Sequence, residues 1–169
     1  MSSLKSFYKN KRILVTGHTG FKGTWLTACL LKFNSKIMGY SKIDNRLKSY
    51  KKMCNYQKVK NVYADILDYK RLKKSVLDFK PQIIFHLAAQ SLVSESFKSP
   101  LDTVTTNTIG TTNILNISRQ LKSLVSLIII TSDKCYLNKE FQRGYKETDI
   151  LGGEDLYSAS KASAEIIFK

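Results

Sequence analysis

The feature that most constrains the fold is a glycine-rich segment that directly follows a short apolar run. The run Ile13-Leu14-Val15 precedes Gly17, Gly20 and Gly23, and an apolar segment with helical spacing comes next. This order predicts a buried parallel strand, a tight turn and a helix. The N–H groups that open such a helix have no partner within it and attract an anion, most often a phosphate.

Each glycine has a reason in a turn of this kind. Gly17 allows the tight bend, Gly20 lets the backbone approach a pyrophosphate, and Gly23 lets the helix pack closely on the strand. The spacing is G-x-x-G-x-x-G, whereas the commonest dehydrogenases have G-x-G-x-x-G. Three glycines can also serve backbone geometry alone, so the pattern is a weak indicator by itself.

The length of 169 residues and the apolar content of 43% are typical of one domain with its own core. Because no segment is long and apolar enough for a signal peptide or a membrane span, we expect a cytoplasmic protein without membrane attachment. The cysteines and histidines show no metal-site spacing, so reduced thiols and no metal are expected. These residues are Cys29, Cys54, Cys135, His18 and His86.

The net charge of +15 raises nucleic-acid binding as an alternative function. Lysines outnumber arginines 23 to 5, they are scattered along the chain, and no nucleic-acid motif accompanies them. We therefore expect a solvated lysine-rich surface and no nucleic-acid partner, an expectation that salt-dependent retention on DNA would contradict.

Apolar strand-like segments alternate with helical ones along the chain. Strands are predicted at 13–15, 37–40, 59–64, 83–87 and 124–130, and helices at 25–33, 69–79 and 100–121. The lysine-rich segment 44–58 receives no assignment. The alternation predicts an α/β fold with a Rossmann-like, doubly wound parallel sheet, which binds ligands at the carboxyl ends of its strands. Residues 1–169 are expected to lack the last strands and the substrate-binding part.

The residues after the second and third strands do not decide how the adenosine end of a dinucleotide would be bound. An acid after the second strand often holds the ribose of NAD, but the sequence there is Gly39-Tyr40-Ser41-Lys42. Asp44 lies further along, and Lys42 leaves a preference for NADP open. Asp65, after the third strand, can meet the adenine amino group or cap the helix at 69–79.

Small residues follow the fourth strand. Ala88 and Ala89 would let a nucleotide lie against the backbone. His86 lies inside the apolar run just before them, and we expect a core histidine there and no ligand.

Polar residues leave the fifth strand together as Thr131-Ser132-Asp133-Lys134. About two dozen residues later, Tyr157 and Lys161 take positions i and i+4, which share one face of a helix. A neighbouring ammonium favours the phenolate form of tyrosine, so the pair predicts a general base. A Tyr-x-x-x-Lys pair is common by chance, but its order after the strand end and the glycine turn predicts a single cleft.

Together these motifs resemble the extended short-chain dehydrogenase/reductases, and most of all the CDP-glucose 4,6-dehydratases among them. The motifs Gly-His-Thr-Gly-Phe-Lys-Gly and Thr-Ser-Asp-Lys-Cys-Tyr are specific to these dehydratases. Other shared segments are His86-Leu87-Ala88-Ala89-Gln90, Asn107 with Gly110, Gly152-Gly153-Glu154-Asp155 and the Tyr157/Lys161 pair. The resemblance covers nearly the entire chain, although members of this family are roughly twice as long.

The resemblance implies NAD as the cofactor. It places Asp65 and Ile66 at the adenine, and Tyr157 and Lys161 at the nicotinamide ribose. The residues implied in NAD binding are Gly17, Thr19, Gly20, Phe21, Lys22, Gly23, Asp65, Ile66, Leu87, Ala88, Ala89, Asn107, Tyr157 and Lys161.

The reaction implied by the resemblance converts CDP-glucose to CDP-4-keto-6-deoxyglucose, in deoxysugar and surface-polysaccharide (O-antigen) biosynthesis. It oxidises C4, removes water across C5 and C6, and reduces C6. Tyr157 would take the proton of the 4-hydroxyl with Lys161 beside it, and Ser132 would bind the same oxygen. Asp133 and Lys134 would serve the elimination, with Lys134 acting either as the base or as a cation that polarises the ketone. A homodimer is implied for the full-length protein.

Two other functions remain as alternatives. A nucleotide-sugar 4-epimerase shares the glycine turn and the Tyr157/Lys161 pair, but it has no need of Asp133 and Lys134. A truncated chain that binds a dinucleotide and catalyses nothing is the second alternative.

Overall fold

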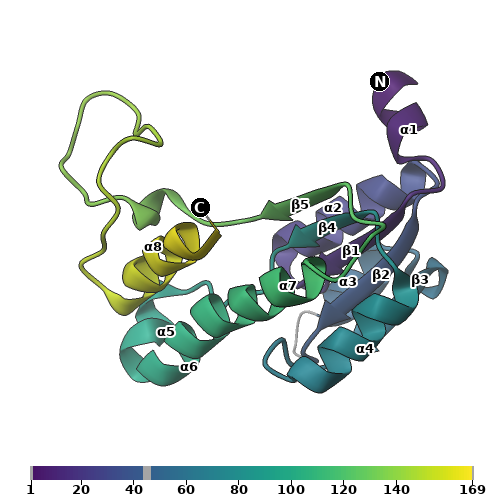
Figure 1. Cartoon of the computed structure of the whole chain (residues 1–169), viewed down its shortest axis with the longest axis horizontal. Coiled ribbons are helices and arrows are strands. Elements are labelled where there is room, and N and C mark those ends of the chain that lie inside the picture. The colour runs from purple at the N-terminus through teal and green to yellow at the C-terminus, as the bar shows by residue number, and fades with distance from the viewer. Residues whose placement is uncertain (1, 44–46, 169) are drawn as a thin grey trace. The chain divides into compact units, whose positions relative to one another are not determined.

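The computed structural model describes residues 2–43 and 47–168. Within this part of the chain, five parallel strands form one sheet in the order β3-β2-β1-β4-β5 (Figure 1). The strands are β1 Arg12–Thr16, β2 Lys36–Ser41, β3 Val59–Tyr63, β4 Ile83–His86 and β5 Ser126–Ile129. The reversal of strand order at β1 confirms the predicted Rossmann-like, doubly wound sheet.

Helical segments connect the strands. The α-helices are α1 Ser2–Tyr8, α2 Phe21–Lys32, α3 Leu47–Met53, α4 Tyr69–Phe79, α5 Val93–Lys98, α6 Pro100–Val104, α7 Gly110–Ser118 and α8 Leu156–Phe168. Two 3₁₀ turns, η1 Tyr56–Lys58 and η3 Asp133–Cys135, and a π-helical segment, η2 Thr105–Ile109, complete the described elements. None of the helices in residues 2–43 and 47–168 is long and apolar enough to cross a bilayer.

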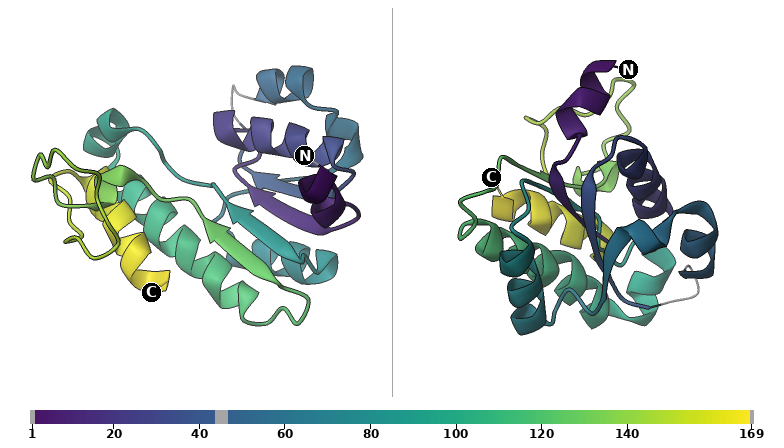
Figure 2. Two further views of the ribbon diagram at one scale, coloured as in Figure 1. Left: turned by 90° about the horizontal axis from the view of Figure 1, so that it is seen from above. Right: turned by 90° about the vertical axis from the view of Figure 1, so that its right-hand side faces the viewer.

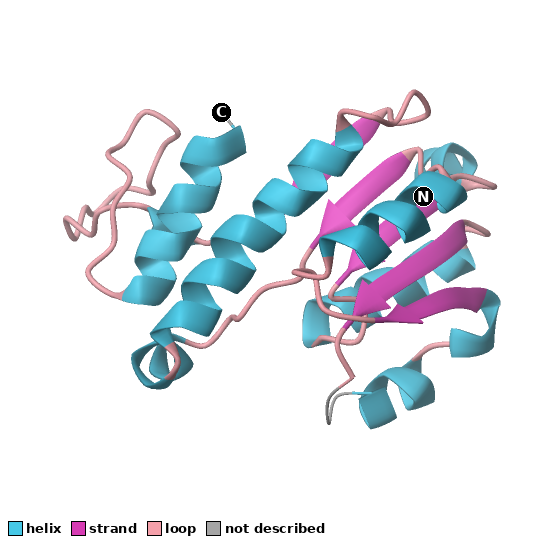
Figure 3. Ribbon diagram, turned by 60° about the horizontal axis from the view of Figure 1, so that its bottom comes forward, coloured by secondary structure: helices cyan, strands magenta, loops and turns pink. Residues whose placement is uncertain are grey.

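The chain forms two compact units. The first contains the residues up to Ala88 together with Asn116–Ile129, and it holds the whole sheet. Its helices α2 and α3 lie on one face of the sheet and α4 lies on the other (Figure 2), as right-handed crossovers between parallel strands require. The second unit contains Ala89–Leu115 and the residues from Ile130 onward. In it, α8 packs against α5, α6 and η3 (Figure 3).

The core of the first unit is built around β1, which has a strand on each side. Ile13 pairs with Ile37 of β2 and with Ile83 of β4, and all three side chains are buried. Val15 of β1 and Leu30 of α2 belong to the same cluster. Because successive side chains of a strand point to opposite faces, Leu14 is buried on the other face of the sheet.

Some predicted boundaries were wrong. The fifth strand begins at Ser126 and not at Leu124, because the Leu124 N–H donates to the Leu121 carbonyl in a turn. The predicted helix at 100–121 ends at Ser118, and its middle is the π-helical segment η2. The segment 44–58 contains the short helix α3, whose only buried side chain is Tyr50 and which therefore lacks an apolar stripe. Asp44 lies outside the described residues.

We expect Ile13→Ala to lower the free energy of unfolding by about 2–5 kcal/mol, because it leaves a cavity in the central strand. Urea unfolding followed by circular dichroism measures this loss. Ile43→Ala is the matched control, since that side chain is 66% exposed and surface changes stay within about 0.5 kcal/mol. Equal losses in the two variants would contradict a core centred on β1.

Candidate active site

The glycine turn between β1 and α2 is packed backbone against backbone. Gly17 has a positive φ of 67°, and a Cβ there would lie 2.9 Å from the backbone of Leu87 and Ala88. A Cβ on Gly23 would collide with the Gly17 carbonyl oxygen. Both positions therefore require glycine, for conformation at Gly17 and for close approach at both. This agrees with the roles predicted for these two residues.

Thr16, which the sequence analysis did not single out, joins this turn to β4. Its hydroxyl oxygen accepts from the N–H groups of Leu87 and Ala88, each at 3.1 Å, and bonds Nδ1 of His86 at 2.8 Å. Because the two amides occupy the oxygen lone pairs, the hydroxyl proton goes to His86. His86 is only 2% exposed, so the prediction of a core histidine is confirmed.

The start of α2 fits an anion. Gly20 is the N-cap, and no side chain caps the helix among the described residues. The first intrahelical bond is donated by Thr24, so the amides of Phe21, Lys22 and Gly23 precede the hydrogen-bonded ladder. The first turn contains no acidic residue, and Lys22 adds a positive charge to the helix dipole. The pyrophosphate of a dinucleotide fits this charge and these donors.

His18, the second residue of the turn, lies fully buried in a hydrogen-bond network. Its Nε2 meets Oδ1 of Asn61 at 3.0 Å and its Nδ1 meets the Ser41 hydroxyl at 3.2 Å. Thr19, predicted to contact the cofactor, is buried beside it and bonds Ser41 at 2.9 Å. A side chain at Gly39 would collide with the His18 ring.

The direction of each bond in this network follows from Asn61. Its amide nitrogen donates to the carbonyls of Tyr56 and Val59, so its oxygen accepts, from Tyr50 as well as from His18. Nε2 of His18 is therefore the donor and Nδ1 the acceptor. A ring with one donor and one acceptor nitrogen is a neutral imidazole. Burial lowers the pKa of His18 to about 4, against the opposing effects of hydrogen bonds to Asn61 and the Tyr40 backbone.

Asp65 lies just after β3 and forms an ion pair with Lys42, which lies just after β2. Their Nζ and Oδ2 atoms are 2.8 Å apart. The other carboxylate oxygen of Asp65 accepts from the Leu67 N–H at 2.9 Å. The alternative that Asp65 caps the next helix is wrong, because Asp68 caps α4 by accepting from the Arg71 N–H. Ile66 is buried.

The segment that leaves β5 is tied to α8 in the second unit. The Lys161 ammonium, 6% exposed, donates to the Ile130 carbonyl at 3.2 Å, and the Thr131 hydroxyl donates to the Glu165 carboxylate. Lys161 and Glu165 are one turn apart, so two consecutive residues of the segment meet one face of α8. Tyr157, one turn earlier, is 8% exposed. Glu165 follows Lys161 by four residues, just as Lys161 follows Tyr157, so its place on the same helix face was readable from the spacing although it was not predicted.

Ser132 caps η3, which begins with Asp133 and Lys134. The Ser132 hydroxyl donates to the Asp133 carboxylate at 3.0 Å, and Asp133 and Lys134 are exposed. Asp155, just before α8, accepts from the Ser158 N–H at 2.9 Å and from its hydroxyl. Burial raises the pKa of Asp155, but these bonds and the nearby charge of Lys134 lower it overall.

Asn107 is buried in η2, where it joins the segment after β4 to α8. Its oxygen accepts from the Gln90 N–H at 2.9 Å, and its nitrogen donates to the Gln90 carbonyl at 3.0 Å and to the Ser160 hydroxyl at 2.8 Å. A π-helical turn inside an α-helix often marks a functional residue.

The predicted site residues fall in both units. The first unit holds Gly17, Thr19, Gly20, Phe21, Lys22, Gly23, Asp65, Ile66, Leu87 and Ala88, and the second holds Ala89, Asn107, Ser132, Asp133, Lys134, Tyr157 and Lys161. Within the first unit, the turn meets Leu87 and Ala88. Within the second unit, Ile130 and the residues of η3 contact α8.

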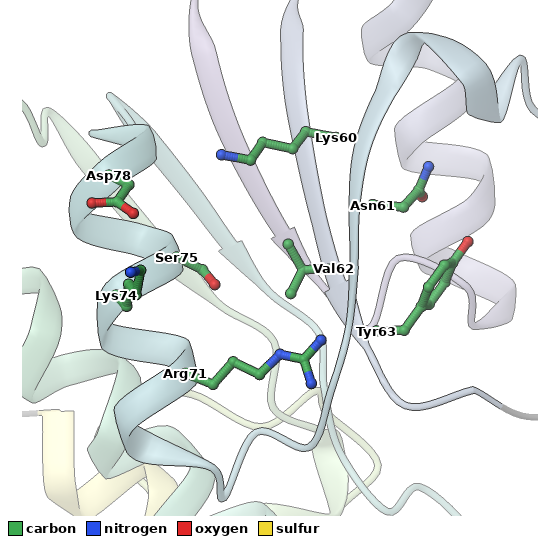
Figure 4. Close-up of a pocket in the computed structure, with 8 residues that line it drawn as sticks. All are labelled: Lys60, Asn61, Val62, Tyr63, Arg71, Lys74, Ser75 and Asp78. Carbon is green, nitrogen blue, oxygen red and sulfur yellow. The ribbon is translucent and has the colours of Figure 1, made fainter.

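A hollow beside β3 contains none of the predicted site residues. It lies between β3 and α4, and its lining includes the cations Lys60, Arg71 and Lys74 with Asp78 (Figure 4). In the close-up, Lys60 and Val62 point toward α4, whereas Asn61 and Tyr63 lie on the other side of the strand. The hollow is thus lined mainly by cations among its charged residues, and no residue of the glycine turn lines it.

Comparison with known proteins gives consistent matches. A family described as GDP-mannose 4,6 dehydratase matches residues 14–169. CDP-glucose 4,6-dehydratase of Salmonella typhimurium is 40% identical over 164 residues, covering 96% of this chain and 46% of that protein. The chain spans about half the length of the curated relatives it matches.

Solved structures support the fold. The dTDP-glucose 4,6-dehydratase of Bacillus anthracis in complex with NAD has a TM-score of 0.75 and 26% identity, with coverage of 93% of this chain and 49% of that one. An epimerase of Methanothermobacter thermautotrophicus has a TM-score of 0.88 and 23% identity, with coverage of 99% of this chain and 49% of that one.

Burial of His18 predicts how stability depends on pH. The pKa is about 4 in the folded chain and 6.5 in the unfolded one, so the unfolded state binds more protons between these values. The stability is therefore complete above pH 6.5 and falls as the pH decreases toward 4, by about 2 kcal/mol at pH 5. We expect His18→Asn to lose less stability than the parent between pH 7 and pH 5 in urea unfolding. Parallel pH profiles for the two proteins would contradict the neutral, buried ring.

Proposed function

Since this chain belongs to the GDP-mannose 4,6 dehydratase family, we propose that it is the cofactor-binding part of an NAD-dependent nucleotide-sugar 4,6-dehydratase. The observation that carries the proposal is the polar segment Ser132-Asp133-Lys134, which follows a chain tied by Ile130 and Thr131 to the helix of Tyr157 and Lys161. Oxidation followed by dehydration requires a base for an alcohol, an acid for the departing hydroxyl and a group that stabilises charge on the ketone oxygen.

The glycine turn supports NAD as the cofactor. The amides of Phe21, Lys22 and Gly23 would hold the pyrophosphate, and the glycine backbone would allow it to come close. When bound, NAD would accept a hydride from C4 of the sugar and return it to C6. The backbone after β4, which meets the turn at Ala88, would lie against the nucleotide.

We assign the first proton transfer to Tyr157. As the phenolate, its oxygen takes the proton of the sugar 4-hydroxyl, and Ser132 hydrogen-bonds the same sugar oxygen. The Lys161 ammonium lies one helical turn from Tyr157 and is fixed by its bond to the Ile130 carbonyl.

We assign the elimination to Asp133 and Lys134. Asp133 donates a proton to the departing 6-hydroxyl. The charge of Lys134 lowers the pKa of Asp155, just before α8, and Lys134 is exposed next to Asp133. We assign to Lys134 the stabilisation of negative charge on the ketone oxygen while the C5 proton passes to water.

CDP-glucose is the proposed substrate, on the basis of the two specific motifs and the 40% identity to CDP-glucose 4,6-dehydratase of Salmonella typhimurium. A homodimer is the proposed assembly of the longer protein. Exposed apolar side chains on helices of the second unit, Leu101, Ile109 and Ile166, support an interface there.

The assay for this function is incubation of CDP-glucose and NAD with the chain and with the longest reading frame that contains it. We expect the longer protein to release a sugar nucleotide lighter by one water, detected by mass spectrometry, because the Asp133-Lys134 pair serves dehydration. A product of unchanged mass that differs at C4 would assign an epimerase instead. Turnover by neither protein, with NAD bound, would favour the alternative of a non-catalytic dinucleotide-binding chain.

Two variants of the longer protein separate oxidation from elimination. Tyr157→Phe should lose both steps, whereas Asp133→Asn should still reduce NAD and lose water about 10²–10⁴-fold more slowly, as expected for a missing general acid. Absorbance of the reduced cofactor and product mass report the two steps. Asp78→Asn is the matched control, because Asp78 is an exposed residue of α4. Unimpaired water loss by Asp133→Asn would contradict the assignment.

A further inference from the structure

The ion pair between Lys42 and Asp65 lies where dinucleotide folds distinguish NAD from NADP. Each residue lies close to the end of a strand: Lys42 is the first residue after β2, and Asp65 is the second residue after β3. These strands are adjacent and parallel, with Ser41 in register with Tyr63. The two side chains therefore leave the same carboxyl edge of the sheet, and their charged atoms are 2.8 Å apart.

The charge at this edge matters because the two cofactors differ there by one phosphate. A carboxylate after the second strand binds the ribose 2′-hydroxyl of NAD, and a cation at this place accommodates the 2′-phosphate of NADP. The described residues after Tyr40 are Ser41, Lys42 and Ile43. The Ser41 hydroxyl is engaged by Thr19 and His18, so Lys42 is the charged group that this strand end contributes among them.

Asp65 is held in place for its contact with Lys42. One carboxylate oxygen accepts from the Leu67 N–H at 2.9 Å, and the backbone carbonyl of Asp65 accepts from the Tyr40 hydroxyl at 3.1 Å. The N–H of Ala64 donates to the Ser41 carbonyl at 3.0 Å, which continues the β2-β3 pairing up to Asp65. The Asp65 carboxylate is thus held by hydrogen bonds of its own segment, and the long side chain of Lys42 reaches it.

We propose that Asp65 directs cofactor choice by neutralising Lys42, so that the site takes NAD although a cation follows β2. The inference rests on the proposed function, because it requires a dinucleotide at the glycine turn. A 2′-phosphate would have to compete with Asp65 for Lys42 and would approach a carboxylate of its own sign. The uncharged 2′-hydroxyl of NAD neither competes with Asp65 for Lys42 nor is repelled by the carboxylate.

Titration calorimetry of the 169-residue chain with NAD and with NADP, at one ionic strength, tests this. The parent should bind NAD more tightly than NADP. Asp65→Asn should move the ratio of the two dissociation constants toward NADP by about tenfold, since a unit charge at ion-pair distance is worth about fivefold in bulk water and more where water is partly excluded. Adding Lys42→Met to Asp65→Asn should remove the gain. Lys60→Met, an exposed lysine on β3, is the matched control, and circular dichroism confirms folding of each variant.

The outcomes separate this inference from the proposed function. If the parent binds NAD but Asp65→Asn weakens both cofactors equally, Asp65 contacts the cofactor without governing Lys42, and the inference fails. Equal or tighter binding of NADP by the parent also overturns it. If a folded parent binds neither dinucleotide, the proposed function fails and the inference fails with it. A gain for NADP that survives Lys42→Met would show that another group binds the phosphate.

Discussion

The first unit depends on the close approach of backbone segments at Gly17. The end of β1, the start of α2 and the residues after β4 meet there with no side chain between them, because Gly17 and Gly23 lack a Cβ that would collide with their neighbours. The Thr16 hydroxyl binds the two amides that follow β4. This packing places the N-terminus of α2 at the carboxyl edge of the sheet, with its first amides available to an anion.

Two polar contacts extend the site from the turn to the neighbouring strands. The neutral His18 ring fills the space above Gly39 and connects the turn to β2 and β3 through Ser41 and Asn61. The Lys42–Asp65 pair then closes the outer end of the same edge. In the second unit, Lys161 and Glu165 bind the two residues that precede Ser132. One helix thus carries the proposed base and also holds the segment that carries the proposed acid.

The sequence predicted those parts of the fold whose causes are local. The helix α4 matches its predicted span of 69–79, although Asp68 caps it and not Asp65, which was the predicted candidate. The start of β5 and the π-helical segment around Asn107 were not predicted, because a turn at Leu121 and contacts with distant residues determine them. The network of His18 and the partner of Lys42 also depend on residues far along the chain. Residue types and spacing indicate candidate groups, but the contacts that orient them require the tertiary structure.

The central claim is that the amides at the start of α2 receive the pyrophosphate of NAD. Titration of NAD into the ¹⁵N-labelled chain, followed by amide chemical shifts, tests it directly. The largest shifts should occur at Gly20, Phe21, Lys22 and Gly23, and inorganic pyrophosphate should reproduce part of them. Saturable binding that leaves these amides unchanged and shifts others, such as those around Lys60 and Lys74, would contradict the account.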